Sequence, residues 1–222
     1  MSAIFSPGKF APLLVLFDLI EQEKTLNKSM NKEEKHSKTI EVIKNHVGFA
    51  LGAALMPVPG IDLLAVSAVQ LNMLRTLAKI YGVSFVDVLG KNIVSAVVGS
   101  SAARLGASLI KAIPGVGTII GELSMPALSG ASTYALGKVV ASHFEHGGTL
   151  EDIDLTKAKK GYESEIENGK KAAEEVSRTE PPAQNHADAA MEKIRKLSEM
   201  KDAGIITEDE FKQLKERLLA QI

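Results

Sequence analysis

The sequence predicts an all-α protein: a bundle of helical hairpins rich in glycine and alanine, followed by a separate C-terminal two-helix hairpin. Three observations support this fold class. Apolar residues recur at the three- and four-residue spacing of amphipathic helices in most of the chain. Prolines and glycines are concentrated between these stretches, where they end helices. No segment shows the alternation of apolar and polar residues that is typical of a half-buried strand.

Charged residues are distributed unevenly along the 222-residue chain. Residues 45–143 carry only nine charged side chains, whereas the whole chain has 26 Lys and Arg and 27 Asp and Glu. A central region with so few charges is typical of a large buried core or of a body embedded in a membrane. The formal net charge of −1 gives no basis for binding nucleic acid. The chain has no cysteine, which excludes disulfides and thiolate catalysis.

The first part of the chain, residues 1–38, is predicted to form an amphipathic helix and a polar linker. Residues 21–38 are rich in lysine, glutamate and asparagine, which indicates a solvated face or a loop. Asp18 interrupts the apolar run that precedes it, and no basic segment comes before that run. We therefore expect a cytoplasmic protein without a signal peptide. The apolar residues at helical spacing are Phe10, Leu13, Leu14, Phe17 and Ile20.

Four apolar helices are predicted within the next part, residues 39–148, and the first two form a hairpin. The first covers about residues 39–56, and the second has Asp62 in its first turn and stops at Gly82. The turn between them is predicted at Pro57, Pro59 and Gly60, because proline lacks a backbone donor and cannot continue a helix.

The third and fourth helices are predicted to form a second hairpin. The third begins after an N-cap within residues 84–87 and extends to about residue 113. Pro114 and Gly115 then form the turn. The fourth covers about residues 118–144, bends at Pro126, and ends before Gly147 and Gly148.

Small residues recur every fourth position in this body and predict close helix packing. Such stripes let helix backbones approach each other, which contributes most where lipid surrounds the helices; a tightly packed soluble bundle is the alternative. The longest uncharged runs are shorter than the roughly 20 apolar residues that span a bilayer. We therefore expect hairpins that enter one leaflet rather than cross it. The small residues singled out are Gly48, Gly52, Ser95, Gly99, Ala103 and Ala107.

Polar residues within the apolar helices are candidates for a buried polar site. Asp62 and Gln70 lie eight residues apart and share one helical face. Asp62 either caps its helix and neutralises Arg104 or Lys111 inside the bundle, or binds an ion or relays protons. His143 and His146 are spaced as half of a metal site, but no further ligand pair accompanies them, so no metal is expected.

Catalytic motifs are not found in the sequence. Lys91 follows a glycine, but the upstream glycine and the hydroxyl residue of a phosphate-binding loop are missing. No G-x-S-x-G motif occurs either. We therefore expect a protein without a cofactor that is not an enzyme.

The C-terminal part consists of a charged helix with a proline-containing linker, residues 149–186, and a two-helix hairpin, residues 187–222. Gly204 ends the first hairpin helix, and Thr207 with Glu210 forms a capping box for the second. Ile206 and Phe211 occupy the positions of a hydrophobic staple. A unit this small buries too little apolar surface to be stable alone, so it must dock on something. The residues predicted to form this oligomerisation seam are Ile194, Leu197, Ile206, Phe211, Leu214 and Leu218.

The sequence resembles two known bacterial domains. The order of a Pro-x-Pro turn, Asp62, Gln70 and Tyr81-Gly82 resembles the YcjF-like domain of unknown function over about residues 39–148. That resemblance implies a membrane-associated protein that works beside a GTPase, so any nucleotide would reach it through a partner. The pattern around Gly204, Thr207 and Phe211 resembles the short C-terminal domain called SHOCT, which implies oligomerisation or partner docking.

Together these features predict a non-enzymatic, self-assembling protein at the cytoplasmic face of the inner membrane. The helical body would associate with lipid, and the C-terminal hairpin would join copies of the chain into a homo-oligomer. A soluble helical adaptor that docks a GTPase or another partner protein is the alternative.

Overall fold

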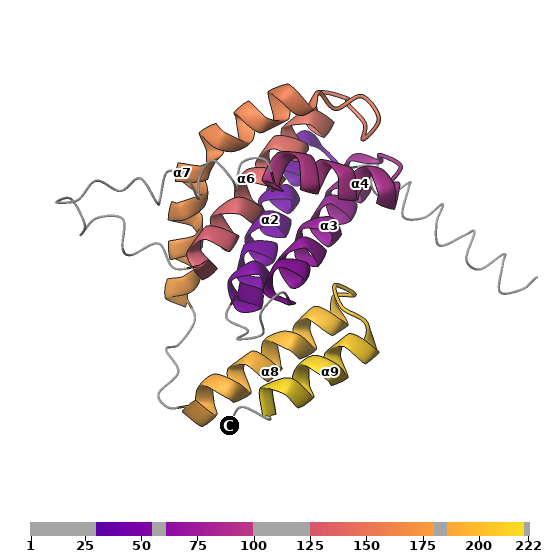
Figure 1. Ribbon diagram of the computed structural model, residues 1–222. Helices are drawn as coiled ribbons and strands as arrows, with labels where there is room; N and C mark the ends of the chain where they lie inside the picture. Colours follow the sequence, from indigo (N-terminus) through magenta and orange to yellow (C-terminus); the bar gives the residue numbers. More distant parts are fainter. Residues whose placement is uncertain (1–29, 55–60, 100–124, 180–185, 220–222) are drawn as a thin grey trace, which may run out of the picture.

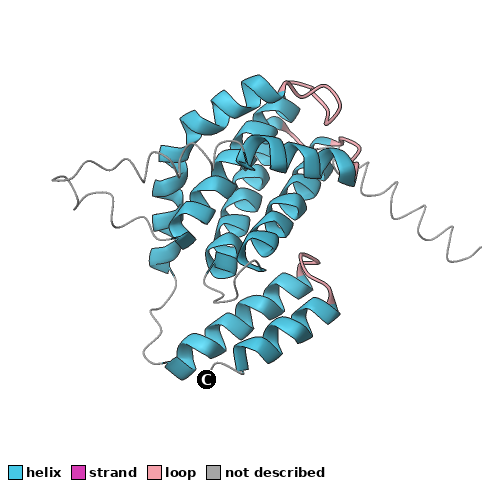
Figure 2. Cartoon of the chain, viewed as in Figure 1, coloured by secondary structure: helices cyan, strands magenta, loops and turns pink. Residues whose placement is uncertain are grey.

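The computed structural model describes residues 30–54, 61–99, 125–179 and 186–219 (Figure 1). Every regular element in these ranges is a helix (Figure 2), which confirms the predicted all-α class. The predicted N-terminal helix and both predicted turns, with Pro57, Pro59, Gly60, Pro114 and Gly115, lie outside the described residues. The helices are α2 (Lys32–Ala54), α3 (Ile61–Tyr81), α4 (Asp87–Val94), the π-helix η1 (Ser95–Gly99), α6 (Met125–Glu145), α7 (Leu155–Thr179), α8 (His186–Asp202) and α9 (Glu208–Leu219).

Helix α2 begins seven residues before the predicted start at residue 39. Asn31 and Glu34 form a reciprocal capping box: the Glu34 backbone N–H donates to Asn31 Oδ1 at 2.8 Å, and the Asn31 N–H donates to Glu34 Oε2 at 3.0 Å. The first turns of α2 are exposed. These turns carry no apolar periodicity, so the sequence pattern predicts a start that is too late.

Glycine ends the helices where the sequence predicts. Gly82 and Gly204 have φ angles of 70° and 68°, in the left-handed region that residues other than glycine rarely adopt. The Val83 N–H donates to the Ala78 carbonyl at 2.8 Å, and the Gly82 N–H donates to the Lys79 carbonyl at 3.2 Å. This is a Schellman motif, and it satisfies carbonyl groups at the end of α3. The predicted stop of α3 is confirmed.

Helix α4 differs from its prediction in two ways. Its N-cap is Val86, which makes no side-chain capping hydrogen bond, whereas the sequence indicated a capping side chain in residues 84–87. Asp87 in the first turn instead forms an ion pair with Arg75 of α3 at 2.8 Å. The expected long helix also changes to π-helical geometry at Ser95, in η1. The rest of that predicted helix, residues 100–113, lies outside the described residues.

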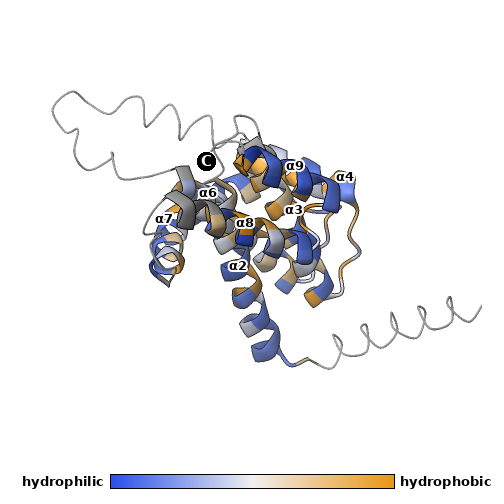
Figure 3. Cartoon of the chain, turned by 90° about the horizontal axis from the view of Figure 1, so that it is seen from below, coloured by the Kyte–Doolittle hydropathy of each residue, from blue (hydrophilic) through white to orange (hydrophobic). Residues whose placement is uncertain are grey.

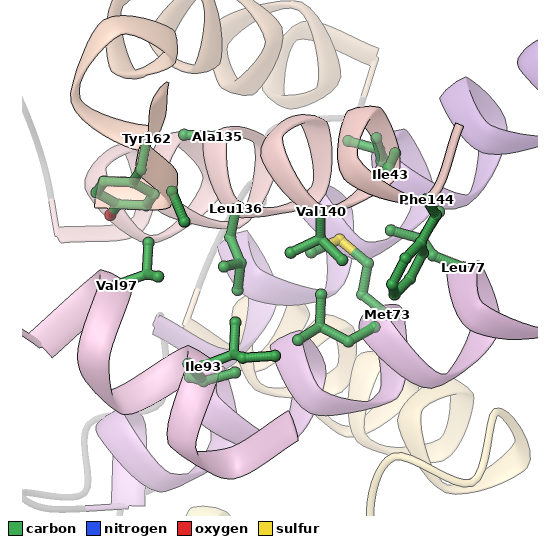
Figure 4. Packing of buried hydrophobic residues seen from close by; sticks show 14 of the residues in the cluster. Ile43, Met73, Leu77, Ile93, Val97, Ala135, Leu136, Val140, Phe144 and Tyr162 are labelled. Atoms are coloured by element: carbon green, nitrogen blue, oxygen red, sulfur yellow. The ribbon is translucent and has the colours of Figure 1, made fainter. Parts of the chain in front are cut away.

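The bundle core is formed by α2, α3, α4, η1, α6 and α7 (Figure 4). Helices α6 and α7 run antiparallel and share the most extensive packing. A Cβ added at Gly169 would lie 2.9 Å from the Ala131 Cα, so the backbones of these two helices meet at this point. The described central helices therefore have few charged residues because they form a packed interior. Its largest fully buried side chains include Ile43, Met73, Leu74, Leu77, Leu136 and Tyr162.

The C-terminal helices α8 and α9 lie side by side below α2 and α3 (Figure 1). Seen from below, α9 combines hydrophilic and hydrophobic residues along its length, as an amphipathic helix does (Figure 3). The structure thus confirms a helical bundle with a C-terminal two-helix hairpin, and it places that hairpin on the bundle.

Candidate docking interface of the C-terminal hairpin

The hairpin has the local structure that its sequence predicts. The Thr207 N–H donates to Glu210 Oε2 at 2.7 Å, and the Glu210 N–H donates to Thr207 Oγ1 at 3.2 Å, which confirms the capping box. At the end of α8, the Ile205 N–H donates to the Met200 carbonyl at 2.8 Å in a second Schellman motif. The turn and both helix ends are therefore fixed by residues within the hairpin itself.

The apolar face of the hairpin packs against the C-terminal end of α2 and the N-terminal half of α3. Leu197 and Met200 are 0% exposed, as are Ala50 and Val69 on the bundle side. We call this set of side chains the docking cluster. Its buried members are Ala50, Ala53, Ala65, Val69, Leu197, Met200, Ile205, Ile206, Leu214 and Leu218, with Phe49, Val66, Ala68, Ile194 and Phe211 partly buried around them.

All six residues predicted for oligomerisation belong to the docking cluster. Leu197, Ile206, Leu214 and Leu218 are buried there, and Ile194 and Phe211 pack against them. Sequence reasoning missed the surface that receives them. Its alanines are ordinary helix formers, and nothing in one sequence links residues 50–69 to a hairpin that begins only at His186.

The two glycines of the predicted packing motif in α2 contact different helices. A Cβ at Gly52 would lie 3.2 Å from Cγ of Lys196 in α8, so this glycine lets the hairpin approach closely. A Cβ at Gly48 would lie 3.6 Å from Cγ1 of Val176 in α7. In η1, Ser95 and Gly99 are exposed. Ala103 and Ala107 lie outside the described residues.

A chain of polar contacts runs along one edge of the docking cluster. His46 is buried, with Nδ1 2.7 Å from the Val42 carbonyl oxygen and Nε2 3.0 Å from Asn72 Oδ1. The Asn72 amide donates to the carbonyl of Ala203 at 3.5 Å. These contacts connect α2 to α3 and α3 to the end of the first hairpin helix. The sequence carries no signal for this connection.

Gln70 lies in the bundle interior rather than in the docking cluster. Its side-chain amide donates to Ser132 Oγ at 3.1 Å and to Thr133 Oγ1 at 3.3 Å. The Tyr162 hydroxyl donates to the same Ser132 oxygen at 2.8 Å, and burial raises the pKa of that hydroxyl. In this network Ser132 is hydrogen-bonded to an amide and a phenol, neither of which is a general base at neutral pH. The network joins α3, α6 and α7.

The other predicted polar residues are placed only in part. Asp62 lies in the first turn of α3, but its side chain is outside the described residues, as is Arg104. Nε2 of His143 is 2.9 Å from Asp152 Oδ1, whereas Nδ1 of His146 is 2.7 Å from the carbonyl of Ser142. The Thr149 backbone N–H, and then His143, hold the pKa of the Asp152 carboxyl below its usual range. Over the described ranges, no three histidine, aspartate or glutamate side chains are grouped to hold a metal ion.

None of the helices in the described part of the chain has the length and apolarity needed to span a bilayer.

A helical bundle that carries a docked C-terminal hairpin is the class of protein that this geometry defines. The chain belongs to the family of the domain of unknown function DUF697, whose model matches residues 20–168, and a short C-terminal domain (SHOCT) matches residues 192–219. This confirms the two resemblances; the first match begins before and ends after the expected range of 39–148. Magnetosome membrane protein 22 of Magnetospirillum gryphiswaldense is 35% identical over 155 residues, which cover 67% of this chain and 80% of that protein. No solved structure matches the chain.

Proposed function

We propose that the protein is a non-enzymatic assembly protein that associates with the cytoplasmic face of the inner membrane. Its helical body would contact lipid, and its C-terminal hairpin would connect copies of the chain. The observation that carries the proposal is the docking cluster, in which a hairpin with its own caps packs on a surface of small apolar residues. Its buried members are apolar, as the residues at the centre of a protein–protein interface are, and here both sides belong to one chain.

Two further observations support the membrane part of the proposal. A relative that shares 35% of its residues with this chain over 155 positions is described as a magnetosome membrane protein. The chain also has the short uncharged runs expected of hairpins that enter one leaflet. The described parts of these runs, residues 47–54, 92–99 and 125–137, contribute to the bundle core, whereas the turns with Pro57, Pro59 and Pro114 lie outside the described residues. The non-enzymatic part of the proposal is supported by the buried polar network, in which Gln70 and Tyr162 donate hydrogen bonds to Ser132 and neither is a base that could activate its hydroxyl.

Cell fractionation followed by a carbonate wash tests the membrane association. We expect the full-length chain to stay in the membrane pellet after the wash, because carbonate removes proteins held only by charge. Recovery in the soluble fraction would contradict the proposal. That result is the one predicted by the alternative, a soluble adaptor that docks a GTPase or another protein.

Light scattering coupled to size exclusion tests the self-assembly. We expect the protein mass, measured in detergent and corrected for bound detergent, to be a multiple of the 23.7 kDa chain mass. A mass of one chain at every concentration would remove self-assembly from the proposed function. It would leave the membrane association to be decided by the fractionation.

A further inference from the structure

The docking cluster raises a difficulty for any assembly that uses the hairpin. The four apolar residues that form the buried part of the predicted seam are covered within a single chain. In the described part of the hairpin, the large apolar side chains that stay exposed are Met191 at 72% and Leu219 at 50%. Two residues at the open end offer little area for a stable interface between copies. A hairpin docked on its own bundle therefore has no seam left to present to a neighbour.

We propose that two copies of the chain assemble by exchanging their hairpins, so that α8 and α9 of one copy pack on α2 and α3 of the other. The inference rests on the self-assembly in the proposed function and names its interface. Exchange resolves the difficulty because the partner's surface is identical to the one that the hairpin already covers. Every contact of the docking cluster is rebuilt between chains, and no new complementary surface is needed.

The contacts between hairpin and bundle suit such an exchange because they separate cleanly from the rest of the fold. The caps of α8 and α9 are internal to the hairpin, so it can leave the bundle as a unit without losing them. On the bundle side, the core formed by Ile43, Met73, Leu77 and Tyr162 is a different cluster from the one that the hairpin covers. Between the described residues, exchange opens the docking cluster, the approach of Lys196 to Gly52 and the Asn72–Ala203 contact.

The connection between α7 and α8 is short. Helix α7 ends at Thr179 and α8 begins at His186, so six residues join them, and two of these are Pro181 and Pro182. This connection is the segment that would pass from one copy to the other in an exchange.

Concentration decides which of the two forms is populated. Both bury the same apolar surface, but a hairpin on a short connection meets its own bundle at an effective concentration on the order of millimolar. We therefore expect the closed monomer in dilute solution and exchanged copies where chains are crowded. Confinement of the chain to a membrane surface, as the proposed function requires, provides such crowding.

A pair of introduced cysteines reports directly on which bundle a hairpin occupies. A Cβ at position 52 would lie 3.4 Å from the Cβ of Lys196, close to the separation of about 3.5–4.5 Å that disulfides adopt. The natural chain has no cysteine, so every cross-link comes from the introduced pair. Gly52→Cys and Lys196→Cys are placed on separate chains that carry tags of different size. The two chains are co-expressed, concentrated and oxidised.

We expect a mixed disulfide dimer that disappears on reduction and that exceeds the control several-fold. The control pairs Gly52→Cys with Glu216→Cys, because Glu216 is exposed on α9, outside the docking cluster. Thermal unfolding of each variant before oxidation checks that it is folded. The new Cβ at position 52 meets a flexible lysine stem, which can move aside at little cost.

The double variant Gly52→Cys/Lys196→Cys on one chain distinguishes a failure of exchange from a failure of self-assembly. The disulfide of the double variant shows that the two positions can be cross-linked within one chain. Suppose that this disulfide forms, that the mixed pair gives no more dimer than the control, and that light scattering still reports an oligomer. Exchange is then wrong, and the copies assemble through another surface. A one-chain mass at every concentration would overturn exchange together with the self-assembly on which it rests. If phosphatidylglycerol vesicles abolish both cross-links, lipid occupies the surface of α2 and α3, which would also overturn exchange.

Discussion

Ser132 is the residue at which three helices of the bundle are held together. It accepts hydrogen bonds from Gln70 of α3 and Tyr162 of α7, while it lies on α6 itself. Buried polar groups cost free energy when they lose a partner, so a network of this kind favours one arrangement of helices over its alternatives. The hydrogen bonds of Ser132 therefore fix how α3, α6 and α7 are aligned, beyond what apolar burial specifies.

Removing one donor of this network is expected to destabilise the bundle measurably. Tyr162→Phe deletes the hydroxyl that donates to Ser132 at 2.8 Å and leaves the ring in place. We expect the free energy of unfolding to fall by about 1 kcal/mol, the usual net worth of such a bond. Urea unfolding followed by circular dichroism gives this value. Tyr134→Phe, on a half-buried ring, is the matched control and should change stability by less than about 0.5 kcal/mol.

The same hydroxyl predicts a loss of stability at alkaline pH. Burial raises the pKa of Tyr162 above its ordinary value of 10.0. Because the folded state holds this proton more tightly than the unfolded state, the contribution is complete below about pH 10 and is lost as pH rises through the folded pKa. Urea unfolding between pH 9 and 11 should show this decline. The slope should be shallower in Tyr162→Phe, with the remainder arising partly from Tyr134, whose pKa burial also raises. Equal slopes in the two proteins would contradict the assignment.

Among the elements, α6 and α7 form the closest pair, and their contact depends on missing side chains. Gly169 faces the backbone of Ala131. A Cβ added at Gly130 would lie 2.9 Å from the Cβ of Ala173. Small residues here permit an approach that larger ones would prevent. In this pair the close approach is made between helices inside the bundle.

Gly169→Ala is expected to destabilise the protein although alanine is the better helix former. The added methyl would lie 2.9 Å from the Ala131 Cα, and a backbone atom cannot move aside as a side-chain end can. Overpacking of this kind costs about 1–3 kcal/mol, which exceeds the gain in helix propensity. The melting temperature should therefore fall. Gly99→Ala is the control, since no atom of the described residues lies within 4 Å of its added Cβ, and it should leave the melting temperature unchanged or raise it.

The elements also show how far the sequence alone can be used. Local signals succeeded: Gly82 and Gly204 end helices, and Thr207 with Glu210 starts one, because each acts within a single turn. The start of α2 was misplaced because its first turns lack an apolar face, and the π-helical turn at η1 has no motif in the sequence. The docking cluster was predicted from one side only. Which surface receives the hairpin is a long-range contact, and local periodicity carries no information about it.

For the whole molecule, the docking cluster converts a bundle and an appendage into one folded unit. The hairpin supplies Leu197 and Met200, and the bundle supplies Ala50 and Val69, all of them fully excluded from solvent. Neither part would keep its apolar face covered if the other were absent. If copies exchange hairpins as proposed, stability and assembly depend on the same side chains, and a variant that opens the interface should affect both.

Leu197→Asp tests that link. The side chain is 0% exposed in the docking cluster, and burying an unpaired carboxylate costs several kcal/mol, more than one small interface can offset. We expect the hairpin to leave the bundle, which should speed hydrogen–deuterium exchange at the C-terminal end of α2 and the first turns of α3. An exchanged hairpin would pack on the same surface of α2 and α3 in its partner, so the protein mass should also fall to that of one chain. Met191→Asp places the same charge on α8 at a position that is 72% exposed, and it should leave both measurements unchanged. An oligomer that persists in Leu197→Asp, with faster exchange in α2, would show that the hairpin serves the fold of the single chain and that copies meet through a different surface.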